Sequence, residues 1–191
     1  MSDEKTNIEF ELVQRAQRGD EKAFEELVVL CDHQVLNVAY SMTGSLTDAQ
    51  DIYQDTFMRA YSSIHGFRFQ SSFRTWVMRI AMNQAINWRR KRKLRSFLPL
   101  DSNEDNMQHI DWTTDANPTN SMYSGEILSQ IRAAMDMLSA KERAIFTLRH
   151  FQEIKIKEIA HILGCAEGTV KNLLFRATKK MQKALQNYVE A

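Results

Sequence analysis

Hydrophobic residues recur every three to four positions along most of the chain, and strict alternation of apolar and polar residues is nowhere sustained. In the stretch 156–163, for example, Ile156, Ile159, Ala160 and Leu163 occupy positions i, i+3, i+4 and i+7. This spacing places side chains on one face of an α-helix, whereas a strand requires a period of two. Glycine and proline, which disfavour helices, number only 6 and 2 in 191 residues. The pattern predicts an all-α fold.

One stretch interrupts the helical pattern. Between Arg95 and Arg132 the chain contains no lysine or arginine, and Pro99 and Pro118 lie among several Asn, Ser and Thr residues. The acidic residues of this stretch are Asp101, Glu104, Asp105, Asp111, Asp115 and Glu126. Low hydrophobicity and charge of a single sign make such a segment difficult to bury. We therefore predict two small helical domains, residues 1–95 and 122–191, joined by an acidic flexible linker at 96–121.

The second predicted domain has three helices joined by short turns. The first begins after Ser139, which forms a predicted capping box with Glu142. Its apolar face would contain Ala144, Ile145, Leu148 and Phe151. The helix at 156–163 follows, and Gly164 is suited to end it because glycine readily adopts the left-handed C-cap conformation. A third helix is predicted from Thr169 onward.

The third helix has an apolar stripe and an opposite polar face. The stripe consists of Val170, Leu174, Ala177 and Met181. The opposite face consists of Gly168, Asn172, Phe175, Arg176 and Lys179, with Lys171 at its flank. Since Arg, Lys and Asn can contact base edges and phosphates in the major groove, the pattern indicates a DNA-binding helix-turn-helix. A three-helix bundle with a solvated basic face is the alternative.

An acidic ridge is predicted on a helix of the first domain. The segment "TDAQDIYQDTFMRAY" begins with Thr47 and Gln50, which are spaced as a capping box. Its buried stripe would consist of Ala49, Ile52, Tyr53, Phe57, Ala60 and Tyr61. Asp48, Asp51 and Asp55 then fall together on the exposed side. This ridge is either a surface for a basic protein partner or simply a solvated face.

The next helix of the first domain combines aromatic, amide and basic side chains. Phe73, Val77, Ile80 and Trp88 mark its packed side. Beside them lies a strip of Trp76, Arg79, Asn83, Asn87 and Arg90, which leads into the basic run 89–95. Such groups suit single-stranded or partly opened nucleic acid, and the preceding loop with Phe67 and Phe69 could help to wall a pocket for an extruded base. Alternatively, both phenylalanines anchor the loop to the core.

Charge and composition narrow the possible functions. The net charge is only +1, although six positive charges lie within residues 89–95, because acidic residues are concentrated in the linker and the acidic ridge. The two cysteines, Cys31 and Cys165, and five scattered histidines form no recognisable metal, disulfide or catalytic pattern. No run of eighteen apolar residues is present, and the N-terminus lacks the pattern of a secretion signal. We expect a cytoplasmic, non-enzymatic protein with no cofactor, metal, membrane insertion or small-molecule substrate.

Three blocks of the sequence resemble signature blocks of bacterial sigma factors, and the short chain is similar to the extracytoplasmic-function kind. They are "DAQDIYQDTFMRAY", "SSFRTWVMRIAMNQAINWRRKRK" and "LSAKERAIFTLRHF" with the following "IKEIAHILGCAEGTVKNLLFRA". The resemblance implies that core RNA polymerase, promoter DNA and an anti-sigma factor are partners. It further implies that the acidic linker runs toward the polymerase active centre and the RNA exit path.

The resemblance also implies roles for particular residues. Polymerase binding would involve Asp48, Asp51, Gln54 and Asp55. The opened minus-ten element would contact Phe67, Phe69, Ser72, Trp76, Arg79, Asn83, Asn87, Trp88, Arg89, Arg90 and Lys91. The minus-thirty-five duplex would contact Arg149, Lys157, Thr169, Lys171, Asn172, Phe175, Arg176 and Lys179.

One position departs from the family pattern. Leu173 stands where family members commonly carry a basic residue, so we expect weaker or altered reading of the upstream element. Two other functions stay open from the residues alone: a one-component transcription regulator that binds DNA unaided, and a protein that keeps the fold but acts only by binding partners.

Overall fold

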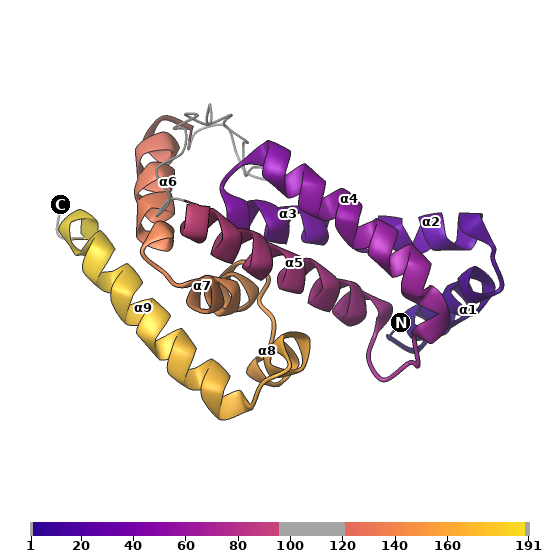
Figure 1. Ribbon diagram of the computed structural model, residues 1–191. Coiled ribbons are helices and arrows are strands. Elements are labelled where there is room, and N and C mark those ends of the chain that lie inside the picture. Colours follow the sequence, from indigo (N-terminus) through magenta and orange to yellow (C-terminus); the bar gives the residue numbers. More distant parts are fainter. Residues whose placement is uncertain (1, 96–120, 190–191) are drawn as a thin grey trace.

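The computed structural model describes residues 2–95 and 121–189, and every regular element within these ranges is helical (Figure 1). The first lobe comprises α1 (Ser2–Gln17), α2 (Glu21–Val29), α3 (Asp32–Thr43), α4 (Leu46–Ser63), the 3-10 helix η1 (Ile64–Gly66) and α5 (Phe73–Arg95). The second lobe comprises α6 (Ser121–Asp136), α7 (Ala140–Phe146), the π-helical turn η3 (Thr147–Phe151), α8 (Ile156–Leu163) and α9 (Glu167–Val189). The predicted all-α class is confirmed, while the predicted linker lies, apart from Ser121, outside the described residues.

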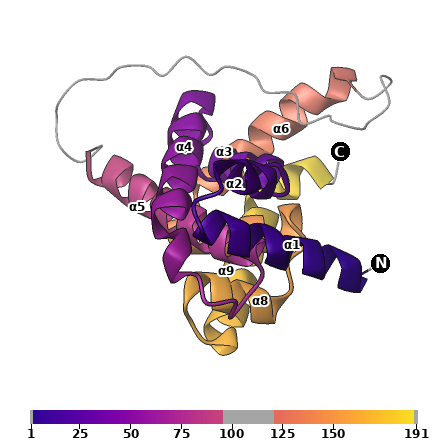
Figure 2. The ribbon, with the colours of Figure 1, turned by 90° about the vertical axis from the view of Figure 1, so that its right-hand side faces the viewer.

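The two lobes pack directly against each other through α5. Figures 1 and 2 show α5 between α3 and α4 on one side and α7 and α8 on the other. Buried residues of both lobes form one hydrophobic cluster, which includes Val38, Met42, Met78, Met82, Ile145, Ile159 and Ile162. Burial of this apolar surface stabilises the closed arrangement by roughly 25 cal/mol per Å² removed from water.

Each lobe also has a core of its own. In the first lobe, α1, α2 and the ends of α4 and α5 enclose a cluster around Val13, Leu27 and Phe73. In the second lobe, α6 and the turn after it pack along α9 through Met135, Leu138 and Met181 among others. The shared cluster therefore lies between two separate cores and joins them.

Polar groups at the helix ends set where several elements begin and stop. Ser139 and Glu142 form the predicted capping box of α7, and Gly164 ends α8 in the left-handed conformation, φ 61°. The predicted capping box of Thr47 and Gln50 is wrong: the Ser45 hydroxyl accepts from Asp48 N–H, so α4 begins at Leu46. Ser45 precedes Thr47 by two residues, and the earlier hydroxyl already satisfies the first turn.

Two residues expected in buried stripes are exposed. Tyr61 is 44% exposed because it lies near the end of α4, where its ring packs edge-on against Phe24 and its hydroxyl donates to Glu21. Phe151 is 43% exposed. It ends a π-helical turn, in which Gln152 N–H bonds to Thr147 C=O, and the wider turn rotates Phe151 off the line of Leu148.

The shared core predicts unequal effects for two methionines of the first lobe. Met82 is fully buried in the cluster between the lobes, whereas Met58 on α4 is 71% exposed. Met82→Ala should lower the free energy of unfolding by about 2–5 kcal/mol, because it removes buried apolar atoms and leaves a cavity. Met58→Ala should change it by less than about 0.5 kcal/mol.

Urea unfolding followed by far-ultraviolet circular dichroism measures both values under the same conditions. The two substitutions are chemically identical, so any difference reports burial alone. Equal losses of stability would contradict the shared core.

Candidate nucleic-acid interface

An acidic ridge on α4 faces solvent in the first lobe. Asp51, Gln54 and Asp55 are exposed along it. Asp48 is half-buried instead, and its carboxylate accepts a 3.1 Å hydrogen bond from Nε1 of Trp88 on α5. The ridge thus leaves three of the four predicted partner-binding side chains accessible, while Asp48 ties the start of α4 to the end of α5.

Helix α5 exposes part of the predicted strip for opened nucleic acid. The exposed members are Arg79, Asn83, Asn87, Arg90 and Lys91. Trp88 is half-buried against α4, with the Arg92 guanidinium 5.2 Å from its ring centre. Amide and guanidinium groups on the exposed part can address base edges and phosphates at the same time.

An aromatic cluster anchors the loop that precedes α5. Phe67 is buried, and its ring lies 5.1 Å from the rings of both half-buried Trp76 and Phe69. Phe69 is partly exposed and has a φ of 56°, which is uncommon for a non-glycine residue. Ser72 is exposed, and its hydroxyl accepts a 3.1 Å bond from Thr75 N–H in the first turn of α5. Phe67 therefore holds the loop in place, whereas Phe69 and Ser72 reach the surface.

Arg89 lies between the lobes, unlike its exposed neighbours Arg90 and Lys91. Its guanidinium donates to the carbonyl oxygens of Met42 and Met135 at 3.4 Å each, and to the carboxylate of Asp136. Burial lowers the pKa of Arg89, and the charge of Asp136 partly opposes this. The Met42 carbonyl belongs to the C-terminal turn of α3, where helical carbonyls lack partners and favour a cation.

Arg143 joins the lobes from the other side, and sequence reasoning did not find it. Its side chain is only 4% exposed; Nε donates to the Ser41 carbonyl at 2.6 Å and Nη1 to Asp136 at 2.7 Å. Near the other end of α5, the Thr75 hydroxyl donates to Glu158 of α8 at 2.8 Å. No local pattern marks Arg143 as buried, because it is the first lobe that covers it.

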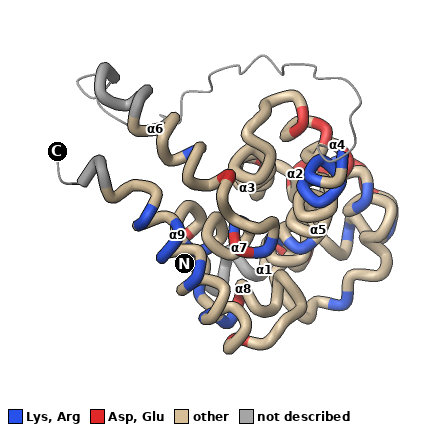
Figure 3. The backbone as a smooth tube through the Cα atoms, turned by 60° about the vertical axis from the view of Figure 1, so that its left-hand side comes forward, with Lys and Arg blue, Asp and Glu red and all other residues tan. Residues whose placement is uncertain are grey.

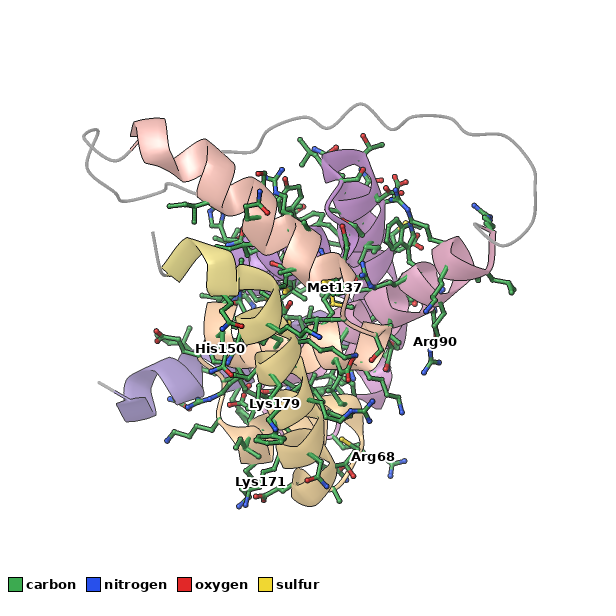
Figure 4. The ribbon with its side chains drawn as sticks, turned by 90° about the vertical axis from the view of Figure 1, so that its left-hand side faces the viewer. Arg68, Arg90, Met137, His150, Lys171 and Lys179 are labelled. Carbon is green, nitrogen blue, oxygen red and sulfur yellow. The ribbon has the colours of Figure 1, made fainter. Side chains whose placement is uncertain are left out.

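Helix α9 presents its predicted polar face to solvent. The exposed residues of this face are Thr169, Lys171, Asn172, Phe175, Arg176 and Lys179. Figure 3 shows lysine and arginine gathered along α9, and Figure 4 shows Lys171 and Lys179 along the same helix. Arg149 of η3 and Lys157 of α8, two elements that precede α9 in the sequence, are also exposed. Leu173 is half-buried and packs against the shared cluster, so it extends the core.

A buried carboxylate holds α9 against α7. Glu142 is fully buried, and it accepts from Lys180 Nζ at 2.7 Å and from Ser139 N–H at 2.9 Å, with Arg176 Nε at 3.4 Å. Burial alone would raise the pKa of Glu142, but the hydrogen bonds from Lys180 and Ser139 outweigh it and lower the pKa below its ordinary value. Glu142 therefore positions a predicted base-reading residue, Arg176, a role beyond the cap found from the sequence.

Other chemistry is sparse in the part of the chain that the structure describes. No group of three His, Cys, Asp or Glu side chains there could hold a metal ion. Burial raises the pKa of the Cys31 thiol to about 12, which leaves it unreactive. No helix within residues 2–95 and 121–189 is both long and apolar enough to cross a bilayer.

Comparison with known proteins identifies relatives that span both lobes. Residues 27–95 match the Sigma-70 region 2 family, and residues 128–181 match the Sigma-70 region 4 family. The RNA polymerase sigma-H factor of Pseudomonas aeruginosa is 34% identical, over 92% of this chain and 93% of that protein. The ECF RNA polymerase sigma-E factor of Escherichia coli strain K12 is 33% identical, over 92% of this chain and 93% of that protein.

Two solved structures share the fold. CnrH in complex with the cytosolic domain of CnrY has a TM-score of 0.68 at 22% identity, covering 94% of this chain and 98% of that chain. The sigma factor RpoE in complex with the anti-sigma factor NepR from Bartonella quintana has a TM-score of 0.67 at 24% identity, covering 86% and 98%. The arrangement of helices in both lobes is therefore one found in solved structures.

The buried carboxylate predicts a pH-dependent contribution to stability. Because the pKa of Glu142 is lower in the folded than in the unfolded chain, its contribution is present above the unfolded pKa and is lost as pH falls through the folded value. Glu142→Gln should lower the free energy of unfolding by about 1–3 kcal/mol near pH 7. Urea unfolding at about pH 7 and at successively lower pH should show wild type and variant converging below about pH 4.5.

Glu167→Gln, at an exposed position on the same helix as Lys180, is the control for removal of a carboxylate. A difference between wild type and Glu142→Gln that does not change with pH would show that Glu142 does not act through its charge.

Proposed function

Because this chain belongs to the extracytoplasmic-function family of bacterial sigma factors, we propose that it binds core RNA polymerase and directs promoter-specific initiation through both of its lobes. Its similarity to the two sigma factors extends over 92% of its length, and the region 2 and region 4 matches fall on separate lobes. We assign residues 1–95 to polymerase docking and minus-ten recognition, and residues 122–191 to minus-thirty-five recognition. The observation that carries the proposal is that both lobes of one chain expose basic and amide side chains, on α5 and on α9.

The exposed surfaces of α4, α5 and α9 each suit a different step of promoter-specific initiation. The ridge of Asp51, Gln54 and Asp55 offers an acidic docking face for polymerase. The exposed amides Asn83 and Asn87 suit base edges of the opened strand. On α9, the basic and amide side chains suit a duplex major groove. The chain acts by binding and adds no catalytic step, and since polymerase and promoter lie in the bacterial cytoplasm, we place it there.

The closed arrangement has to open on the promoter. Elements named minus ten and minus thirty-five lie about 25 base pairs apart, or roughly 85 Å of duplex at 3.4 Å per pair. The 25 residues at 96–120 can span at most about 80–90 Å when fully extended. The covalent connection is thus just long enough for the lobes to separate and read both elements.

Control by an anti-sigma factor is part of the proposal. The solved structures of similar fold contain CnrH with CnrY and RpoE with NepR, the latter named as an anti-sigma factor. A partner that holds the lobes together would keep α5 and α9 too close to each other to contact the minus-ten and minus-thirty-five elements at the same time.

Charge reversal on the α4 ridge tests polymerase docking. Asp51→Lys with Asp55→Lys should abolish run-off transcription from a promoter library with core polymerase, and should reduce association with core polymerase at least tenfold, since several exposed ion pairs are replaced by repulsion. Helical content should stay unchanged, because both side chains are exposed.

The matched control is Glu25→Lys with Glu26→Lys, which makes the same charge change on the exposed side of α2. Equal loss of association in both variants would reduce the effect to net charge and contradict docking at the ridge. Wild-type protein that yields no discrete start sites, yet binds promoter duplex unaided at nanomolar concentration, would favour a one-component regulator.

A further inference from the structure

A strongly cationic pocket lies between the two lobes, and promoter reading accounts for only part of its charge, because Arg132, Lys141, Arg143 and Lys180 have no assigned DNA contact. It has a volume of about 850 Å³, and of the eighteen described residues that line it nine are lysine or arginine, whereas only Asp136 is acidic. The end of α5 contributes Arg89 and Arg90 from the first lobe. Figure 4 shows Arg90 and Met137, two of the lining residues, from the side on which α9 lies in front.

The charges of this pocket are only partly compensated within the described residues. A single carboxylate, Asp136, pairs with both Arg89 at 3.4 Å and Arg143 at 2.7 Å. Burial and the nearby positive charge of Arg89 together lower the pKa of Arg143 to about 10, although the charge of Asp136 opposes them. Two cations in low-dielectric surroundings thus share one anion, which favours the entry of additional negative charge.

Three basic side chains that line the pocket also favour an anionic ligand. Nη2 of Arg132 is buried without a hydrogen-bond partner, and the guanidinium carbon lies 5.6 Å from the ring centre of Tyr40. Lys141 and Arg90 line the same pocket and form no ion pair with any residue that the structure describes. A ligand with several acceptor oxygens would pair with the exposed side chains of Arg90 and Lys141 together.

We propose that this pocket is a binding site for a compact phosphate-rich anion, a short linear chain of phosphates. Guanidinium groups match phosphate oxygens in bidentate geometry, and several of them converge here. Among the described residues no aromatic side chain lines the pocket, so we expect recognition to rest on the phosphates and not on a stacked base. The volume lies in the range of small-ligand sites, which excludes a duplex about 20 Å wide.

Binding at this site couples the ligand to the closed arrangement. Arg89 and Arg90 come from the first lobe, whereas Arg132, Lys141 and Arg143 come from the second. A phosphate chain held by both sets binds the closed form more tightly than the open form and therefore shifts the population toward it. The inference rests on the geometry of the pocket alone and goes beyond promoter recognition.

Isothermal titration calorimetry of the full chain with inorganic tripolyphosphate, in about 0.1 M KCl without magnesium, tests the proposal directly. We expect saturable binding of one tripolyphosphate per chain and no comparable binding of sulfate at matched ionic strength. Lys141→Ser, an exposed position whose substitution leaves the core intact, should weaken binding roughly fivefold. Lys141→Ser combined with Arg132→Gln should weaken it by more than about tenfold.

The matched control, Arg18→Gln with Lys183→Ser, removes two exposed positive charges outside this pocket and should retain wild-type affinity. Tripolyphosphate, ATP and guanosine tetraphosphate are compared: similar affinities show that the phosphate chain alone is recognised, and tighter nucleotide binding assigns the same site to a nucleoside polyphosphate. Absence of saturable binding, or equal losses in pocket and control variants, would overturn the proposal. Tighter binding of a hexaglutamate peptide than of tripolyphosphate would overturn it in favour of an acidic protein segment.

Discussion

The packing of α5 between the two lobes is the constraint on which the rest of the structure depends. Its apolar side contributes Met78 and Met82 to a cluster that contains residues of both lobes. The same helix carries the exposed amides Asn83 and Asn87 on another side. Burial of one side thus determines which side chains of α5 can reach nucleic acid. Because that burial depends on the second lobe, separation of the lobes would expose a further apolar surface of α5.

Two carboxylates pair with four of the basic residues near this junction. Asp136 pairs with Arg89 and Arg143, and Glu142 pairs with Arg176 and Lys180. Each carboxylate therefore connects groups that lie far apart in the sequence. Arg89 and Arg176 have partners in the closed arrangement, whereas their proposed roles in promoter recognition require them to contact DNA. Contacts with the promoter would have to replace these intramolecular pairs, and this exchange makes the basic residues sensitive to the arrangement of the lobes.

In the second lobe, local sequence patterns correctly predicted a helix end and a capping box that depend only on residues close together in the chain. The end of α8 at Gly164 and the capping box of α7 depend on interactions within a few residues, and both are confirmed. Of the predicted apolar positions of α8, Ile159 and Ala160 are buried and Ile156 and Leu163 are half-buried, whereas buried Ile162 was not predicted. The predictions failed where backbone geometry departed from a regular helix. Phe151 follows the expected 100° spacing in the sequence, but the π-helical turn changes that spacing. The exposure of Tyr61 likewise depends on how α4 ends against α2, which periodicity does not describe.

The sequence by itself determined the helical class, the exposure of Asp51 and Asp55 on α4 and the exposed polar face of α9, because the side chains concerned follow helical periodicity along a single segment. Only the tertiary structure decided that Arg143 is buried, that Arg89 lies between the lobes and that a cationic pocket forms there. The physical reason is that burial and charge compensation depend on groups brought together from distant segments. Asp136, Arg89 and Ser41 are close only because the two lobes share a core.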